Sequence, residues 1–266
     1  MPEPDLRGSS RDAVDYRPSL IEDHALIGNM RTAALVSKDG CIDWLCLPRF
    51  DSEACFTALL GTGEHGYWKI APRSAVSETR RHYRGDTLIL ETEWSCESGT
   101  VKLIDFMPPG EVDTVVRCVE GLHGEVAMLS RLKARFGYGE VLPLVEPRHD
   151  RYTAIFAGPN TLYLESDLAE GAPPPSVDFT VREGERVSFA LSHAGAYDAP
   201  PRPVSTSRAE RETMRYWKKW VSGLKVPERW RNLMTRSFIT LKACTYEPTG
   251  GIVAAPTTSL PEGLGG

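Results

Sequence analysis

The sequence predicts a mainly β protein, an antiparallel β-sandwich that is followed by helices. Hydrophobic residues alternate with polar ones at period two from about Ile27 to Leu191, and turn residues separate the runs. Strands that recur roughly every ten residues with turns between them are typical of sandwiches and barrels. After the proline-rich segment 199–203 the spacing of hydrophobic residues becomes helical.

The composition is that of a globular protein with a core. The chain has 266 residues, of which 41% are hydrophobic and 25% charged, so it is neither wholly disordered nor a coiled coil. No hydrophobic run approaches the roughly 18 residues that span a membrane, and residues 1–16 lack the pattern of a secretory signal. We therefore expect a cytoplasmic protein with no membrane partner.

Charge is distributed unevenly along the chain. The net charge is −5, which argues against a chain-wide role in binding nucleic acid. Segment 205–247 nevertheless carries ten basic and four acidic residues, a local charge of +6. Such a segment either binds nucleic acid or forms the solvated face of a docked helix. Its aromatic residues fall on the hydrophobic side, which favours docking, and we expect no nucleic-acid partner.

Several strands can be placed individually. Residues 33–36 and 42–47 flank Asp39-Gly40, and this dipeptide predicts a tight hairpin because glycine accepts the positive φ of the turn. Segments 177–181 and 187–191 are predicted to pair through a second turn. Glu91 and Glu93 are assigned to the exposed face of a strand. One predicted strand has a continuous inner face made of Val126, Met128, Ser130, Leu132, Ala134 and Phe136.

Two hydrophobic stripes at helical spacing follow residue 205. The first contains Met214, Trp217, Val221 and Leu224, and the second contains Trp230, Leu233, Met234, Phe238 and Leu241. Gly223 and Pro227 separate them. Alone, these helices would expose Trp217, Trp220, Trp230 and Phe238 unless they fold back on the sandwich.

No motif for a cofactor or a metal stands out. The six cysteines are spread along the chain and lack zinc-ligand spacing, so we expect reduced thiols. The six histidines are scattered, and Gly61-Thr62-Gly63 lacks the rest of a phosphate loop. Acid pairs such as Glu165/Asp167 are expected by chance among 36 acids. We assign no metal ligand and no cofactor.

Three long stretches carry a family resemblance. They are residues 20–36, beginning Leu-Ile-Glu-Asp-His, residues 40–61, with Ile-Asp-Trp-Leu-Cys-Leu-Pro-Arg-Phe-Asp-Ser, and residues 241–262, with Ala-Ala-Pro-Thr-Thr-Ser-Leu-Pro-Glu. Together they resemble the N-terminal part of bacterial glycoside hydrolase family 15, the glucoamylase and trehalase-like enzymes. The resemblance extends over essentially the whole chain.

The resemblance implies a division of the chain. Members of that family join a supersandwich-like β domain through linker helices to an (α/α)6 barrel that hydrolyses α-glucosidic bonds with inversion. By this resemblance, residues 1–19 are an N-terminal extension, 20–198 the sandwich, and 199–227 the linker and its helix. Residues 228–266 are then the first helix and loop of a truncated (α/α)6 catalytic domain.

The resemblance also implies that this chain lacks its own catalytic groups. In the family, an Asn-Trp-Asp-Tyr-Arg segment and an Arg-Asp pair follow the point reached at Gly266, and the general acid and base come later. Inverting hydrolysis needs two carboxyl groups roughly 6.5–9.5 Å apart. No residue here aligns with either, so we assign no catalytic residue and predict that the chain alone is inactive.

Two segments are the candidates for contact with a sugar. Arg49, Phe50 and Asp51 follow a strand at a proline-led turn that could reach the mouth of the barrel; alternatively, Arg49 and Asp51 pair with each other to order the turn. The loop after the first barrel helix offers hydroxyl groups that could bond a sugar or cap the backbone. Its candidates are Thr257, Thr258 and Ser259.

Two functions remain open. The first is the N-terminal, non-catalytic portion of a family 15 hydrolase. Its partners are a missing barrel, supplied in cis or in trans, and an α-glucan or trehalose-type sugar bound by the intact enzyme. The alternative is a stand-alone carbohydrate-binding or scaffolding β-sandwich module. Trehalose and maltooligosaccharides both remain open as substrates.

Overall fold

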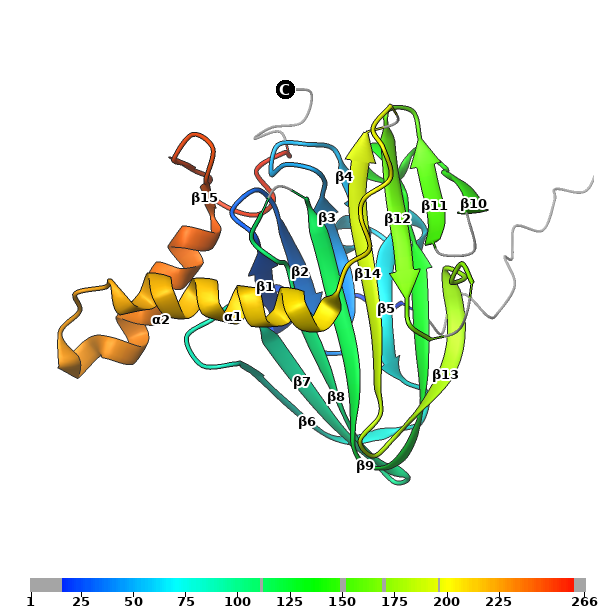
Figure 1. Ribbon diagram of the computed structural model, residues 1–266, viewed down its shortest axis with the longest axis horizontal. Coiled ribbons are helices and arrows are strands. Elements are labelled where there is room, and N and C mark those ends of the chain that lie inside the picture. The colour runs from blue at the N-terminus through cyan, green and yellow to red at the C-terminus, as the bar shows by residue number, and fades with distance from the viewer. Residues whose placement is uncertain (1–15, 111, 149–151, 169–170, 196, 261–266) are drawn as a thin grey trace, which may run out of the picture.

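The computed structural model describes residues 16–260 except 111, 149–151, 169–170 and 196, and within this range the protein is mainly β (Figure 1). The strands are β1 (His24–Gly28), β2 (Ala33–Ser37), β3 (Cys41–Cys46), β4 (Ala54–Phe56), β5 (Tyr67–Pro72), β6 (Val76–Tyr83), β7 (Leu90–Cys96), β8 (Gly99–Phe106), β9 (Thr114–Lys133), β10 (Leu144–Arg148), β11 (Tyr152–Ala157), β12 (Asn160–Ser166), β13 (Ser176–Arg182), β14 (Arg186–Gly195), β15 (Thr245–Tyr246) and β16 (Gly251–Ile252). The helices are α1 (Thr206–Ser222) and α2 (Arg231–Ala243), with short 3-10 turns at Ile21–Asp23, Ala58–Leu60, Gly63–His65, Gly137–Gly139 and Glu228–Trp230.

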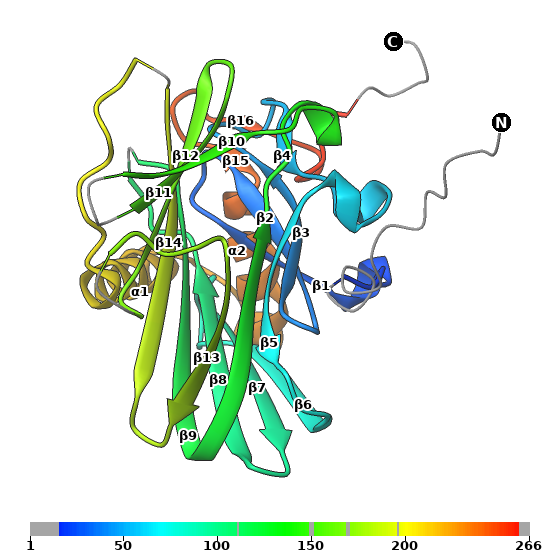
Figure 2. The same cartoon turned by 90° about the vertical axis from the view of Figure 1, so that its right-hand side faces the viewer.

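The strands form two antiparallel layers that share one long strand (Figure 2). The first layer contains β13, the second half of β9, β5, β3, β2 and β1, with β4 beside β3. The second layer contains β6, β7, β8, the first half of β9, β14, β12, β11 and β10. The predicted antiparallel sandwich is therefore confirmed, as is the continuous inner face of residues 126–136.

Glycine allows β9 to pass from one layer to the other. The register against β8 shifts where Gly121 pairs with Val101 and His123 with Thr100, so β9 has one extra residue there. A Cβ on Gly121 would lie 2.0 Å from the carbonyl oxygen of Arg182. Only glycine fits this crossing without moving the backbone.

A buried ion pair joins the two layers at their centre. Arg117 of β9 and Asp105 of β8 are both fully buried, and the Arg117 Nε donates to the Asp105 Oδ1 at 2.8 Å. The other nitrogens of the guanidinium donate to the first layer, to the carbonyl oxygens of Trp68 at 2.6 Å and Gly40 at 2.7 Å. Arg117 therefore donates hydrogen bonds to both layers, to Asp105 in the second layer and to backbone oxygens of the first.

The two helices dock on the sandwich, with α1 lying across the strands of the second layer (Figure 1). Val204, Ala209 and Met214 pack on the outer face of this layer. Glu210 of α1 pairs with Arg84 and Arg186, and Arg84 also pairs with Glu91. Glu91 is thus buried under the helix, with 6% of its surface exposed, so its assignment to an exposed face was wrong: strand periodicity does not register a helix laid over the strand.

A turn of the sandwich fills the junction between the helices. Met30, with φ of 64° and no exposed surface, packs with Trp217 of α1 and with Ile239 and Ala243 of α2. Its carbonyl oxygen accepts a hydrogen bond from the Glu247 backbone at 2.8 Å. The expected docking is confirmed for Trp217, which is fully buried.

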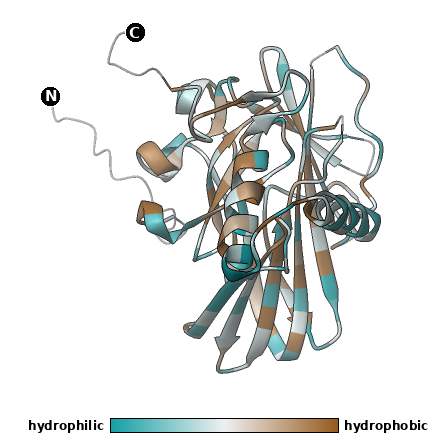
Figure 3. Ribbon diagram, turned by 90° about the vertical axis from the view of Figure 1, so that its left-hand side faces the viewer, coloured by the Kyte–Doolittle hydropathy of each residue, from teal (hydrophilic) through white to brown (hydrophobic). Residues whose placement is uncertain are grey.

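The second hydrophobic stripe does not face the sandwich. The buried residues of α2 are Thr235, Ile239 and Ala243, whereas Leu233 and Leu241 are 65% and 49% exposed. Figure 3 shows hydrophobic residues on the face of α2 turned away from the strands. The side of α2 that sequence periodicity marks as hydrophobic is therefore largely open. None of the described helices is long and hydrophobic enough to cross a membrane.

A histidine with a buried side chain is expected to make the stability of the first layer depend on pH. His24 Nε2 lies 2.9 Å from the Asp43 Oδ2, and its Nδ1 lies 2.9 Å from the Leu20 carbonyl oxygen. Both partners accept hydrogen bonds, so the protonated ring, which donates from both nitrogens, fits this site. Burial lowers the pKa of His24, but the hydrogen bond and charge of Asp43 outweigh it and leave the pKa raised.

A raised pKa in the folded state gives a defined pH dependence. The pair contributes fully below the ordinary histidine pKa of about 6.5, and its contribution is lost as pH rises through the raised folded value. We expect Asp43→Asn to lower the unfolding free energy by about 3 kcal/mol at pH near 6, and by less at mildly alkaline pH. Urea titrations at both values measure this. His123→Asn, at a histidine whose side chain is 79% exposed, is the control. If Asp43→Asn lowered the unfolding free energy equally at both pH values, the raised pKa assigned to His24 would be contradicted.

Candidate functional site

Three segments distant in sequence meet at one end of the sandwich. They are the turn after β3, the β15–β16 hairpin and the loop 253–260 that follows it. They enclose a pocket of about 240 Å³ lined by Arg49, Phe50, Asp51, Tyr246, Thr249, Gly251, Ile252, Val253 and Thr258. Four of the six residues proposed from the sequence, Arg49, Phe50, Asp51 and Thr258, are thus brought together.

Arg49 is held between a carboxylate and an aromatic ring. Its Nε and Nη2 donate to the two oxygens of Asp51 at 2.8 and 2.9 Å, and its guanidinium carbon lies 4.8 Å from the centre of the Tyr246 ring. The hydrogen bond from Arg49 holds the pKa of Asp51 below its usual range. The pairing that orders the turn is therefore present, and it fixes the plane of a guanidinium that borders the pocket.

The backbone around this pair is held by the turn between β1 and β2 and by a contact within its own turn. The amide of Phe50 donates to the carbonyl oxygen of Arg31 at 3.0 Å, and Phe50 itself is buried. The Arg49 amide donates to the Ser52 hydroxyl at 3.1 Å. These contacts leave the Arg49 and Asp51 side chains, 49% and 61% exposed, as the accessible part of the turn.

The loop 253–260 is fastened to the sandwich by three side chains. Trp44 Nε1 donates to the Pro256 carbonyl oxygen at 3.0 Å, and the Tyr138 hydroxyl donates to that of Ser259 at 3.0 Å. The Cys46 Sγ lies 3.4 Å from the Ser259 Oγ. Burial raises the pKa of Cys46 to about 11, so it stays a neutral thiol. Leu260 packs against the same cluster.

These contacts separate the three hydroxyl candidates. Thr258 is exposed and lines the pocket, whereas Ser259 faces Cys46 and Thr257 is half-buried outside the lining. Ser259 thus holds the loop in place, and Thr258 shares the lining of the pocket with Arg49. Tyr246 and Tyr138 were not selected from the sequence. Tyr138 has φ of 57° between two glycines also at positive φ, and Gly-Tyr-Gly was the available signal for this unusual turn.

The chemistry of the pocket suits binding rather than proton transfer. Arginine carries five N–H donors, and Asp51 uses two of them. Thr258 adds a hydroxyl and Tyr246 an aromatic face. Among the described residues that line the pocket, Asp51 alone is a carboxylate, and a glycosidic bond needs a second one to be hydrolysed by acid and base.

A second pocket is lined by two acidic residues whose carboxylates accept hydrogen bonds from backbone amides. Glu165 and Asp167 line a space of about 200 Å³ between β12 and the start of α1. Glu165 accepts from the Val204 amide at 3.0 Å, and Asp167 accepts from the Ser188 amide at 2.6 Å. Glu165 therefore holds the linker just before α1, and Asp167 holds the backbone of β14. In the described part of the chain, no three His, Cys, Asp or Glu side chains converge as a metal site would require.

Comparison with known proteins assigns the chain to a family. A trehalase of Thermoplasma volcanium is 32% identical over 257 residues, covering 92% of this chain and 41% of the relative. A trehalase of Mycolicibacterium smegmatis is 30% identical over 272 residues, covering 91% and 40%. The chain thus spans about two fifths of the length of these relatives. Among solved structures, a "putative kojibiose phosphorylase from human microbiome" aligns over 81% of this chain and 35% of its own at a TM-score of 0.34 and 8% identity, too low to support a shared fold.

The family match covers the sandwich from its first strand to the end of β12. The family described as "Trehalase-like, N-terminal" matches residues 14–168, which is more than half of the chain. These residues contain the turn of Arg49 and Asp51 and both partners of the buried Arg117–Asp105 pair. The chain belongs to the trehalase-like, N-terminal family.

Proposed function

We propose that this chain is the N-terminal portion of a trehalase-like glycoside hydrolase of family 15 that hydrolyses an α-glucoside, with trehalose first among the candidates. Its sandwich and linker support a catalytic (α/α)6 barrel, α2 is the first helix of that barrel, and the acid and base belong to the remainder of the barrel. The boundaries of this division are those predicted from the sequence.

The open face of α2 is the observation that carries the proposal. Leu233 and Leu241 are 65% and 49% exposed, and Trp230, directly before the helix, is 49% exposed. The opposite face of the helix is buried against Met30 and Trp217. Hydrophobic side chains on both sides of one helix are typical of a helix inside a larger assembly. The further helices of a barrel would bury this face.

The pocket around Arg49 supports a role in binding the sugar. It lies directly beside the loop that leads out of α2, so it would border the barrel at the point where the barrel begins. A guanidinium held flat by Asp51 and a threonine hydroxyl offer directional hydrogen bonds to sugar hydroxyl groups. In this proposal Arg49 and Thr258 contact the substrate, and Asp51 positions Arg49.

The proposal is tested with the chain alone and with a fusion. The 266-residue chain should release no glucose from trehalose or maltose. Fused at its C-terminal end to the remaining three fifths of the Thermoplasma volcanium trehalase, it should hydrolyse trehalose and release one glucose as the β-anomer, detected by NMR. Glucose release by the chain alone, or a folded fusion that binds trehalose without hydrolysing it, would contradict the proposal; the latter result favours a sugar-binding module.

Removal of the Arg49 side chain should weaken that activity. Hydrogen bonds to charged groups contribute about 1.5–3 kcal/mol, so we expect Arg49→Ala to lower kcat/KM of the fusion by roughly 10- to 150-fold. Arg80→Ala is the matched control, because Arg80 pairs with Glu78 in the same manner at an exposed site in β6. Equal activity of the two variants would remove Arg49 from the substrate site.

A further inference from the structure

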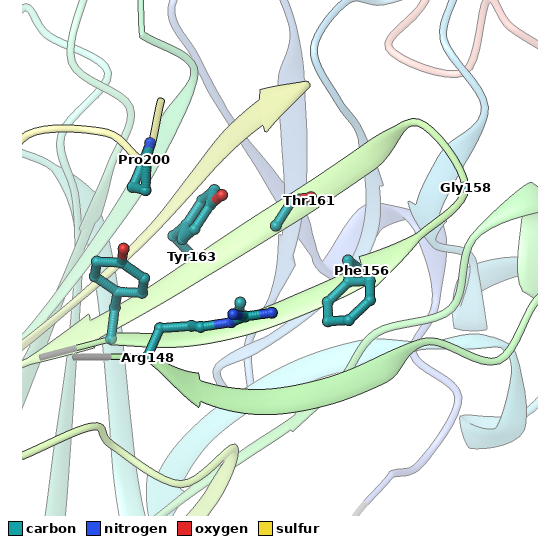
Figure 4. A pocket seen from close by; sticks show the side chains of 8 residues that line it. Arg148, Phe156, Gly158, Thr161, Tyr163 and Pro200 are labelled. Carbon is teal, nitrogen blue, oxygen red and sulfur yellow. The ribbon is translucent and has the colours of Figure 1, made fainter. Parts of the chain in front are cut away.

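A third pocket lies on the outer face of the second layer, away from the site of Arg49. Figure 4 shows it over β11 and β12, with Pro200 at its rim. Its volume is about 300 Å³, and it is lined by Arg148, Tyr152, Ala154, Phe156, Gly158, Thr161, Tyr163 and Pro200. This size is at the lower end of small-molecule sites, which have volumes of about 300–1,000 Å³.

The position of the pocket follows from strand alternation and from the path of α1. Ile155 and Leu162 point into the core between the layers, so their neighbours Ala154 and Tyr163 point outward. On the adjoining part of this outer face, α1 covers the strands through Ala209 and Met214. Among the described helices, none lies over β11 and β12; the segment that leads to α1 passes there, and its Pro200 lines the pocket.

The walls of the pocket are aromatic and preorganised. Tyr152 and Tyr163 are 6% and 9% exposed, and their rings meet edge to face with centroids 5.0 Å apart. Each ring fixes the other, and Phe156 adds a half-buried ring beside them. Aromatic faces attract C–H groups because the π face is the negative part of the ring. A pyranose presents such C–H groups on one face.

The polar groups of the pocket favour a neutral ligand. The Arg148 Nη2 lies 2.5 Å from the Glu146 Oε2, so its charge is balanced by the same strand. Burial raises the pKa of Tyr163, which keeps its hydroxyl a neutral donor. Together with Thr161, Tyr163 and Arg148 give the pocket hydroxyl groups and a paired guanidinium, which can bond the hydroxyl groups of a sugar ligand. An anionic ligand would find no unbalanced positive charge on Arg148.

We propose that this outer-face pocket binds a neutral mono- or disaccharide, as a secondary site separate from the substrate site. The choice of an α-glucoside as ligand rests on the proposed function. The site itself rests on three aromatic rings, balanced charge and hydroxyl groups in one cavity. It would hold substrate near the enzyme without taking part in hydrolysis.

The test is an NMR titration of the ¹⁵N-labelled chain with trehalose, maltose and inorganic phosphate. We expect saturable shifts in the millimolar range for one of the two sugars, centred on the amides of β11 and β12. Phe156→Ala should weaken this binding about tenfold, and Arg148→Ala, at a side chain 50% exposed, should weaken it without risk to the fold. Trp230→Ala, at an exposed aromatic residue directly before α2, should leave it unchanged.

The outcomes separate this site from the proposed function. No saturable sugar shift, or binding of phosphate alone, overturns the secondary site and leaves the fusion experiment unaffected. Shifts that Arg49→Ala removes and Phe156→Ala does not would place the sugar at the pocket of Arg49, which overturns this inference and supports the proposed substrate site. An inactive fusion with intact binding at β11 and β12 would overturn the hydrolase and leave the secondary site standing.

Discussion

Replacement of Arg117 by alanine is expected to lower the free energy of unfolding by about 3–5 kcal/mol, a large fraction of the roughly 5–15 kcal/mol that is typical of folded domains. The variant leaves the Asp105 carboxylate buried, with 0% exposure and without its cation. It also leaves the carbonyl oxygens of Trp68 and Gly40 without the donor that joins the two layers. Urea unfolding followed by tryptophan fluorescence measures the loss.

The contrast with two other variants identifies the cause. Arg117→Met with Asp105→Leu removes both charges together, and we expect it to recover more than half of the loss, because replacing a buried pair with hydrophobic residues is often near neutral. Arg80→Ala breaks an exposed pair, with side chains 69% and 53% exposed, and should cost less than about 1 kcal/mol. A loss for Arg117→Ala no larger than that of Arg80→Ala would show that the pair does not hold the layers together.

Local patterns predicted most of the sandwich, and Arg117 shows where they stop. The hairpin at Asp39-Gly40 and the inner face of residues 126–136 depend on turn chemistry and on period two, which act over a few residues. Arg117 depends on acceptors 49 and 77 residues away in the sequence. No local pattern distinguishes a buried arginine with such partners from one that points to solvent.

Periodicity predicted the buried side of α1 but not the buried side of α2. Periodicity predicted that Trp217 would face a partner, and Met30 is that partner. For α2, periodicity selected the stripe with Leu233 and Leu241, yet Ile239 and Ala243 are the residues that pack on the sandwich. A single stripe is the natural assumption for a helix with one partner, and it fails when hydrophobic residues lie on both sides.

The candidate site was predicted from resemblance more than from physics. Arg49, Asp51 and Thr258 came from motifs in two distant stretches, and the fold brings these stretches to one pocket. Tyr246 was not selected, because its sequence neighbours indicate only a residue before a turn. Its role in the site depends on the Arg49 guanidinium, whose carbon lies 4.8 Å from the centre of its ring. Tyr138 was missed for the same reason, since its acceptor is 121 residues away.

Replacement of Trp217 by alanine is expected to release the helices from the sandwich while most of the strands stay folded. A buried tryptophan reduced to alanine costs about 3–5 kcal/mol, and Trp217 has no exposed surface. Its cluster, with Met30, Leu88, Ile239 and Ala243, is separate from the large core between the layers. The loss therefore falls on α1 and α2, which can open without opening the sandwich.

Hydrogen exchange distinguishes this local release from global unfolding. We expect faster exchange over 206–243 in Trp217→Ala and unchanged exchange at the centre of β8 and β9. Trp217→Phe should cost much less, because the Trp217 Nε1 has no hydrogen-bond partner to lose and a ring still fills most of the space. Equal acceleration in the strands would mean that helices and sandwich unfold as one unit. If release is local, the same variant in the fusion should lower trehalose hydrolysis in proportion to the fraction of open helices, because the docked position of α2 sets where the barrel begins relative to Arg49.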